Sequence, residues 1–257
     1  MIANYHTHTP RCGHATGTEE AYIQAALAAG FHTLGFSDHT PYLFPDGYRS
    51  SFRMAPHQLA GYADTVLRLR KEYAGRIDIP LGVEAEFYPK FFADTVAFLR
   101  DHGIEYMLLA QHLLENEVEG VGAVGPIADP NRLRQYCNQS IEAMHTGLFS
   151  YFAHPDLMHF VGDKQVYRQE IRRLCQAAKA CNVPLEINLL GLRENKHYPN
   201  PLFWQIAAEE GCPAVFGRDA HQPEMLLDPA PEQKARAMVD ALCITILETI
   251  PLRPISG

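Results

Sequence analysis

A regular alternation of short apolar runs with helical patterns, maintained from end to end, constrains the fold of this chain most strongly. Seven apolar runs are expected as strands: Ile2–His6, Thr33–Ser37, Ile79–Val83, Tyr106–Ala110, Tyr151–Ala153, Leu185–Asn188 and Ala214–Phe216. Each run leads into a segment with helical spacing. Strands separated by helices pair in parallel with right-handed crossovers. The sequence therefore predicts an α/β protein, built either as a barrel or as a doubly wound sheet.

The helical segments carry start and stop signals typical of helix ends. Thr18-Glu19-Glu20 provides an N-cap with an acidic first turn, and Gly30 ends that helix after Ala29. The other expected helices are Pro56–Gly75, Phe92–Leu99, Asn131–Met144, Gln165–Cys181, Pro201–Glu210 and Pro231–Leu247. No Ser/Gly-rich linker, block of like charge or solenoid-type repeat divides the chain, so residues 1–257 are expected to form a single domain.

Composition narrows the possible partners. The formal net charge is −8, and no Lys/Arg stripe offsets it, which disfavours nucleic acid and anionic membranes as partners. No apolar run approaches the roughly 20 residues of a membrane span, and the N-terminus lacks a signal-peptide pattern. The six cysteines form no C-x-x-C pair, which fits a reducing, cytoplasmic location.

Histidines and carboxylates follow six of the seven expected strands. The segments concerned are His6-Thr7-His8 with His14 in the loop beyond, Asp38-His39, Glu84-Ala85-Glu86, Gln111-His112, His154-Pro155-Asp156 and Asp219-Ala220-His221. In a parallel barrel the C-terminal ends of the strands share one face, where active sites are built. A single histidine at a strand end is more often an ordinary loop residue, whereas the joint pattern indicates a site for zinc, iron or manganese.

These segments resemble the polymerase and histidinol phosphatase (PHP) family. The residues that carry the likeness are Tyr5-His6-Thr7-His8-Thr9, Cys12-Gly13-His14, Gly35-Phe36-Ser37-Asp38-His39, Gly82-Val83-Glu84, His112, His154-Pro155-Asp156 and Asp219-Ala220-His221. The likeness is greatest to the histidinol-phosphatase branch. It implies a distorted (β/α)7, TIM-like barrel with its active site at the C-terminal ends of the strands.

The resemblance also implies a cluster of about three divalent metal ions. One metal would be held by His6, His8, Glu84 and Asp219, a second by Glu84, His112 and His154, and a third by His14, His39 and His221. Glu84 would bridge the first two metals, because a carboxylate has two oxygens and an imidazole cannot act in this way. Cys12, between the first histidines, is expected to pack in its loop.

The activity implied is hydrolysis of a small phosphate ester, with L-histidinol phosphate as the leading substrate. A hydroxide bridging two metals would attack phosphorus, with Glu84 and Asp219 as the catalytic carboxylates. Arginine would bind the phosphate, and Arg193 is the leading candidate, with Arg11 and Arg53 weaker. His159 stands where an arginine is expected. His197, His159 or a metal-bound water could protonate the leaving group.

Two alternatives remain open at this stage. The first is a PHP phosphoesterase acting on another substrate, such as a nucleotide or a cyclic phosphodiester. The second is a non-catalytic metal-binding protein on a decayed barrel, which the complete set of nine ligands disfavours. The sequence does not predict the metal, the oligomeric state or the effect of Arg218, which precedes Asp219 where a small residue is more usual.

Overall fold

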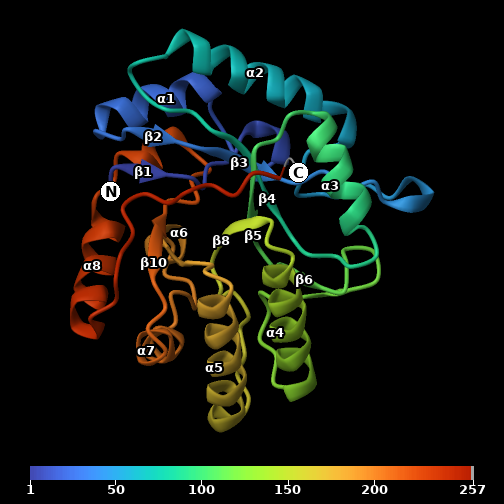
Figure 1. Ribbon diagram of the computed structural model, residues 1–257, viewed down its shortest axis with the longest axis vertical. Helices are drawn as coiled ribbons and strands as arrows, with labels where there is room; N and C mark the ends of the chain where they lie inside the picture. The colour runs from blue at the N-terminus through green and yellow to red at the C-terminus, as the bar shows by residue number, and fades with distance from the viewer. Residues whose placement is uncertain (256–257) are drawn as a thin grey trace.

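Six parallel strands form the central sheet of the computed structural model, which describes residues 1–255 (Figure 1). In spatial order they are β10 (Ala214–Gly217), β9 (Leu185–Asn188), β8 (Phe149–Phe152), β5 (Tyr106–Leu109), β4 (Leu81–Ala85) and β3 (Phe36–His39). Each overlaps a run that the sequence predicts as a strand. The predicted α/β class is confirmed.

A separate parallel pair, β1 (Ala3–Asn4) and β2 (Thr33–Leu34), stands beside this sheet. Beyond β1 the chain forms a parallel bridge between Thr7 and Ala220, which follows β10. The two edges of the sheet are therefore brought together, and the curled sheet is consistent with a distorted TIM-like barrel. The count of seven strands stays a prediction, because the second expected strand is divided at Gly35 into β2 and β3.

Successive side chains along a strand point to opposite faces of the sheet, and the two faces pack into two separate hydrophobic cores. In β5, Met107 and Leu109 face the large core between the sheet and the helices. Tyr106 and Leu108 face a smaller core inside the curl of the sheet, as period-two alternation requires. That inner core also contains Ala3, Tyr5, Tyr151, Ala153 and Val215. It therefore joins β1 to the middle strands β5 and β8 and to the edge strand β10.

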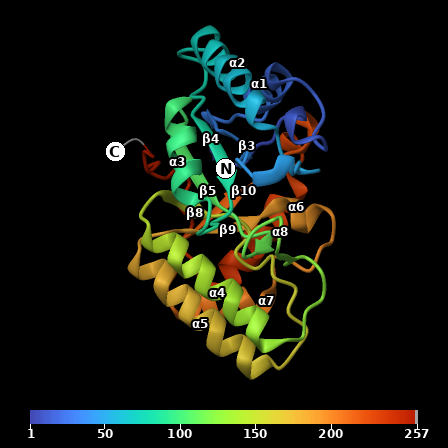
Figure 2. The same cartoon turned by 90° about the vertical axis from the view of Figure 1, so that its right-hand side faces the viewer.

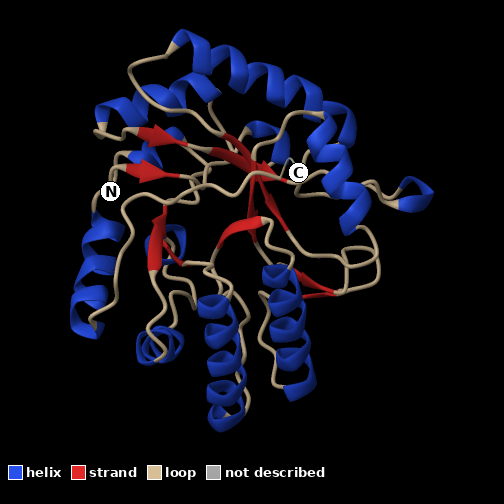
Figure 3. Ribbon diagram, in the orientation of Figure 1, coloured by secondary structure: helices blue, strands red, loops and turns tan. Residues whose placement is uncertain are grey.

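Helices surround the strands (Figure 3). They are α1 (Glu19–Ala28), α2 (Leu59–Glu72), α3 (Phe92–Asp101), α4 (Pro130–His145), α5 (Lys164–Ala180), α6 (Leu189–Arg193), α7 (Pro201–Glu209) and α8 (Ala230–Leu242), with single 3₁₀ turns at Pro10–Cys12, Pro45–Gly47, Pro56–Gln58 and Pro223–Leu226. Helices α4 and α5 pack side by side, as Figure 2 shows.

Within residues 1–255 no helix combines the length and apolar character needed to cross a membrane.

The structure differs from the sequence prediction in three segments. Helix α8 ends at Leu242 rather than Leu247, because Cys243 adopts a left-handed conformation and residues 245–247 pair with the start of β10 instead. A short antiparallel hairpin, β6 (Leu113–Leu114) with β7 (Val121–Gly122), follows β5 where no strand was expected. A short helix, α6, follows β9 at residues 189–193, where no helix was expected, and its N-terminus is capped by Asn188.

One close contact inside the curl leads to a stability prediction. A Cβ added at Gly82 in β4 would lie 2.3 Å from ring atoms of Tyr106, whose hydroxyl donates to the carbonyl oxygen of Tyr5 at 2.9 Å. Gly82→Ala is therefore expected to destabilise the protein by about 1–3 kcal/mol through overpacking. Gly61→Ala is the matched control, because a Cβ on Gly61 in α2 meets no atom within 4 Å. Equal melting temperatures for the two variants would contradict this account of the inner core.

Candidate metal centre

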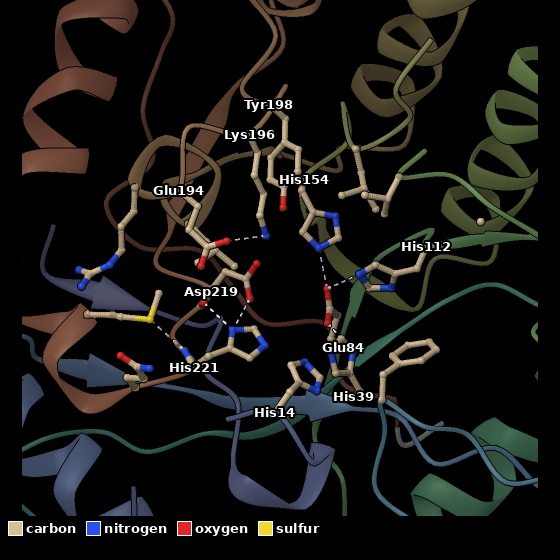
Figure 4. A pocket seen from close by; sticks show the side chains of 18 of the residues that line it. His14, His39, Glu84, His112, His154, Glu194, Lys196, Tyr198, Asp219 and His221 are labelled. Carbon is tan, nitrogen blue, oxygen red and sulfur yellow. Dashed lines mark hydrogen bonds and ion pairs between the residues drawn. The ribbon is translucent and has the colours of Figure 1, made fainter. Parts of the chain in front are cut away.

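All nine side chains predicted as ligands gather at the C-terminal ends of the strands. His6 and His8 follow β1, His39 ends β3, Glu84 lies in β4, His112 follows β5, His154 follows β8, and Asp219 and His221 follow β10, with His14 in the loop before α1. Seven of these residues are labelled in Figure 4, where they face a common space. The structure thus brings together residues that are up to 215 positions apart in the chain, from His6 to His221.

Glu84 lies at the middle of this group and is almost fully buried. Its Oε1 lies 2.7 Å from His154 Nε2 and 3.3 Å from His6 Nε2, while Oε2 lies 2.9 Å from His39 Nδ1. His112 Nε2 is 3.7 Å from Oε1. Oε1 therefore faces imidazoles of both the first and the second implied groups, and Oε2 faces His39 of the third, so this one carboxylate adjoins all three groups.

Asp219 is the second carboxylate of the cluster and faces three of its histidines. Its Oδ1 lies 3.0 Å from His8 Nε2, 3.5 Å from His6 Nε2 and 3.5 Å from His221 Nδ1. Asn188 donates from Nδ2 to the other oxygen at 3.1 Å and so fixes the carboxylate plane. One oxygen of Asp219 is left directed at the three imidazoles.

Ligand-type atoms approach one another within 4.8 Å in several three-residue sets. The sets are His14/His39/His221, His6/His8/Asp219, His6/Glu84/His154, His8/His39/Glu84 and His8/Cys12/His221. The first is the third group implied by the family resemblance, and the second is most of the first group. His112 belongs to none of these sets, although it lies next to Glu84. Buried Cys12 approaches His8 and His221, beyond the packing role expected from sequence.

Several of these buried atoms lack a hydrogen-bonding partner among the described residues. They include His6 Nε2, His8 Nε2, Glu84 Oε2 and Asp219 Oδ1, which all face the cluster. A buried polar atom without a partner destabilises a protein, so native structures rarely leave several of them together. Coordination of divalent cations would satisfy imidazole nitrogens and carboxylate oxygens at once. The donor set therefore fits a metal site.

The electrostatics of the cluster also suit cations. Burial lowers the pKa of His39 to about 4, and burial together with the His8 ring lowers the pKa of His221 to about 3, so both imidazoles are neutral ligands at neutral pH. Burial acts in the same direction on His8, but the nearby carboxylates of Asp219 and Asp38 outweigh it and raise the pKa of His8 to about 9. Carboxylates that hold a proton on a buried imidazole also attract a metal ion to it.

Three further carboxylates lie behind the imidazoles. His6 Nδ1 contacts Glu186 Oε1 at 2.8 Å, and His112 Nδ1 contacts Glu86 Oε1 at 2.8 Å. His8 Nδ1 is 3.4 Å from Asp38 Oδ1. A carboxylate on the far nitrogen fixes the tautomer of a ligating histidine and increases its basicity. Asp38 and Glu86 are among the polar residues that follow the predicted strands, whereas Glu186 lies inside the predicted strand Leu185–Asn188.

Glu186 contacts several groups of the cluster. Besides His6, it accepts hydrogen bonds from the backbone N–H of His154 at 2.9 Å and from Asn188 Nδ2 at 3.1 Å. A Cβ on Gly217 in the neighbouring strand would lie 1.6 Å from its Oε1, so only glycine leaves room for it. Strand period alone could have indicated this residue, since Glu186 and Asn188 lie on the same face of β9.

Two of the residues in the cluster have left-handed backbone conformations. The φ angle is 31° at His154 and 48° at Asp219. Such conformations cost about 1–3 kcal/mol at a non-glycine residue and concentrate at functional sites. At His154 the hydrogen bond from its N–H to Glu186 holds the turn in place.

Arg53, a weaker candidate for phosphate binding, instead supports the cluster from behind. It is buried and contacts Glu86 through NH1 at 3.1 Å and NH2 at 3.0 Å, and Glu117 through Nε at 2.7 Å. Burial raises the pKa of Glu86, but Arg53 and His112 outweigh it and lower that pKa to about 2. Glu86 is thus held as a carboxylate against His112. Arg53 does not line the cavity above the cluster.

A cavity of about 600 Å³ opens above the cluster. Its lining includes Arg193, Glu194, Lys196 and Tyr198, together with Glu84, Asp219 and several of the histidines (Figure 4). Arg193, the leading candidate for phosphate binding, is therefore at the cavity, where NH1 contacts Asp228 at 2.9 Å. Lys196 and Glu194 also line the cavity, although nothing in their sequence spacing distinguishes them from solvated loop residues.

The other predicted substrate and acid–base residues do not line this cavity. Arg11 pairs with Glu19 of α1 and donates to Thr65 Oγ1 at 3.2 Å. His197 and His159 stack on each other, with ring centroids 4.2 Å apart, and His197 Nε2 contacts the carbonyl oxygen of Leu157 at 2.8 Å. These contacts direct the three side chains away from the cluster.

Arg218, the unusual residue before Asp219, also points away from the cluster. Its NH2 contacts Glu232 Oε2 in α8 at 3.0 Å, and its backbone N–H donates to Asn4 Oδ1 at 2.8 Å. Glu232 also accepts from the N-terminal ammonium of Met1 at 2.6 Å. Arg218 therefore ties the end of β10 to α8 and to the N-terminus.

The solved structures most relevant to this geometry are phosphatases. The chain superposes with a TM-score of 0.75 on a histidinol phosphate phosphatase from Lactococcus lactis, solved in complex with zinc, L-histidinol and phosphate, at 18% identity over 97% of this chain and 96% of that one. A second structure, from Listeria monocytogenes, gives a TM-score of 0.67 over 87% of this chain and 96% of that one, at 20% identity. At these identities the likeness supports the fold.

Sequence comparison identifies the family. The chain is 33% identical over 238 residues to a Deinococcus radiodurans protein named "Probable histidinol-phosphatase", covering 86% of this chain and 87% of that protein. It is 27% identical to the histidinol-phosphatase of Bacillus subtilis, covering 84% of this chain and 92% of the relative. Residues 4–189 match the PHP domain. The chain therefore belongs to the PHP family.

Proposed function

We propose that this protein is a metal-dependent phosphomonoesterase that hydrolyses L-histidinol phosphate to L-histidinol and phosphate. The observation that carries the proposal is the convergence of nine ligand-type side chains below an open cavity in a chain of the PHP family. The relatives from Deinococcus radiodurans and Bacillus subtilis, which bear the name histidinol-phosphatase, support the substrate.

About three divalent ions (zinc, iron or manganese) would occupy the cluster. His6, His8 and Asp219 would hold one, Glu84 with His154 and His112 a second, and His14, His39 and His221 the third, with Glu84 between the first two. Such ions lower the pKa of bound water and neutralise charge on phosphoryl oxygens. The zinc found with the Lactococcus lactis structure supports this class of metal.

The remaining residues of the cavity would bind and position the ester. Glu84 and Asp219 keep their charge because they are surrounded by imidazoles: burial raises the pKa of each, but the nearby histidines outweigh it and hold both well below the usual range. Arg193 would bind a phosphoryl oxygen at the cavity wall. We assign no role in proton transfer to His197, because its Nε2 already contacts a backbone carbonyl.

We extend the proposal to the setting of the enzyme. The seven predicted strands would form a single (β/α)7 barrel domain over residues 1–257. All six cysteines are free, and four of them are buried, which supports a cytoplasmic location. The partner would be a small phosphorylated metabolite rather than nucleic acid or membrane, given the net charge of −8.

The test is a steady-state assay of metal-replete protein on L-histidinol phosphate beside unrelated phosphomonoesters, nucleotides and a cyclic phosphodiester. Catalytic efficiency on L-histidinol phosphate should exceed that on the others by about tenfold or more, the ratio typical of a specifically recognised substrate. Equal efficiency on all phosphomonoesters would show a generalist phosphatase, and hydrolysis of the diester alone would contradict the proposal.

Arg193→Ala is expected to raise the KM for phosphomonoesters by about tenfold, because it removes one charge-assisted hydrogen bond to the phosphate. The side chain is half-buried at the cavity wall and is already held there by Asp228, so it is positioned before substrate binds. Arg168→Ala on α5 is the control, because Arg168 is exposed and lies outside the cavity lining. An unchanged KM in Arg193→Ala would remove this residue from the phosphate site.

A further inference from the structure

An ion pair lies in the wall of the cavity, outside the metal cluster. Lys196 Nζ contacts Glu194 Oε2 at 2.9 Å, and Figure 4 shows both side chains facing the space above Asp219 and His154. The side chains retain 37% and 50% of their exposure, so water reaches the pair. Exposed ion pairs contribute little to stability and open readily. This pair is therefore free to exchange partners when a ligand enters.

The backbone that carries the pair is held firmly. The N–H of Lys196 donates to the carbonyl oxygen of Gly191 at 2.9 Å, and the N–H of Glu194 donates to Leu190 at 2.9 Å. Tyr198, two residues further on, is buried, and its ring centroid lies 6.2 Å from that of His154. The side chains can reorient while their Cα atoms stay at a fixed position relative to the cluster. Such anchoring is what a recognition element requires.

The charges around the cavity are unevenly distributed. Among the described residues that line it, the permanent cations are Arg193 and Lys196, and Glu194 is the carboxylate that does not belong to the predicted ligands. Arg193 has its own acidic partner in Asp228. The wall thus offers an ammonium group and a carboxylate side by side, and a ligand that carries one charge of each sign matches both.

We propose that Lys196 and Glu194 form a specificity element for phosphate esters of amino alcohols. Lys196 contacts the phosphoryl oxygens beside Arg193, and Glu194 accepts the ammonium group of the alcohol part. The inference rests on the proposed phosphomonoesterase function and deepens it. When an ester that carries an ammonium group binds, two ion pairs replace the one between Lys196 and Glu194: Lys196 pairs with the phosphate and Glu194 pairs with the ammonium group. An ester of a neutral alcohol has no ammonium group to pair with Glu194, so it forms one ion pair fewer in the cavity and binds more weakly.

The experiment compares L-histidinol phosphate with its deamino analogue, which keeps the imidazole and the phosphate but carries hydrogen in place of the ammonium group. The wild-type protein, loaded with metal, should hydrolyse the amino ester with about tenfold or higher kcat/KM, the preference expected from one charged hydrogen bond. Glu194→Gln should reduce that preference to about twofold or less by slowing the amino ester alone. Lys196→Gln should lower kcat/KM for both esters.

The exposed ion pair between Lys90 and Glu119, with Nζ and Oε1 3.3 Å apart, provides matched controls because neither residue lines the cavity. Lys90→Gln and Glu119→Gln should leave both rates unchanged. A wild-type preference that survives in Glu194→Gln, or an equal loss on both esters in that variant, would overturn the inference while the phosphomonoesterase function stands. A wild-type protein that hydrolyses neither ester nor any other phosphomonoester would overturn the function itself and the inference with it.

Discussion

Glu84→Gln is expected to lower kcat on the order of a thousandfold, the upper range for removing one preorganised electrostatic group. Glu84 is the carboxylate whose two oxygens face different imidazoles, with Oε1 at 2.7 Å from His154 and Oε2 at 2.9 Å from His39. The amide keeps the shape of the side chain but replaces one oxygen by an NH₂ group and removes the charge. A neutral amide cannot bridge two dications in the same way.

The measurement is kcat on L-histidinol phosphate after metal reconstitution, with thermal melting to verify folding. Glu142→Gln is the matched control, because it makes the same chemical change at an exposed position of α4. The control should stay within about twofold of wild type, as surface substitutions away from such features do. If Glu84→Gln retained more than about a tenth of the wild-type rate, a loss of less than ~1.4 kcal/mol in the barrier, the bridging role would be wrong.

Asp219→Asn is expected to be nearly as damaging, with a loss on the order of a hundredfold in kcat. Oδ1 of Asp219 faces His6, His8 and His221 at 3.0 to 3.5 Å, while its other oxygen accepts from Asn188 at 3.1 Å. An asparagine would keep the shape but lose the charge that attracts a cation. Its NH₂ group would also face either the imidazoles or Asn188 Nδ2, which is itself a donor.

The same assay with Asp64→Asn, an exposed aspartate of α2, separates this effect from a general response to the substitution. The loss in Asp219→Asn should diminish at high metal concentration, because the variant binds metal more weakly rather than losing the whole site. A rate unaffected by Asp219→Asn at low metal concentration would contradict the role of this carboxylate.

The sequence was sufficient to predict the parallel α/β fold and the gathering of the ligands. Strand ends are recognisable because apolar runs stop at polar residues: the run that ends at Val83 is followed by Glu84, and the run that ends at Ala153 is followed by His154. The parallel arrangement then places those ends on one face without further information. No knowledge of side-chain distances is needed for that conclusion.

The sequence did not predict which residues meet across the cavity. Arg11 and Arg193 look equivalent as loop arginines, but Arg11 has an acidic neighbour on α1, Glu19, that removes it from the cavity. Lys196 reaches the cavity because α6 and the turn after it bring its loop back over His154, and this depends on the capping of α6 by Asn188. Such contacts depend on loop conformation, which local sequence determines poorly.

The early end of α8 has a similar cause. Residues 243–247 form a short, largely apolar run, Cys-Ile-Thr-Ile-Leu, which is too short for its pattern to distinguish a helix from an extended segment. In the structure the free edge of β10 provides backbone partners, and Leu247 N donates to Ala214 O at 2.8 Å. Tertiary hydrogen bonds therefore decide a segment whose local preference is balanced.

The central claim is that the nine-residue cluster binds divalent metal ions, and elemental analysis of the purified protein tests it most directly. Protein prepared in metal-replete medium and never exposed to chelator is expected to carry between two and three zinc, iron or manganese ions per chain. The exposed-site variant Glu142→Gln should carry the same amount, and Glu84→Gln should carry less. Fewer than one transition-metal ion per chain in the wild-type protein would contradict the account.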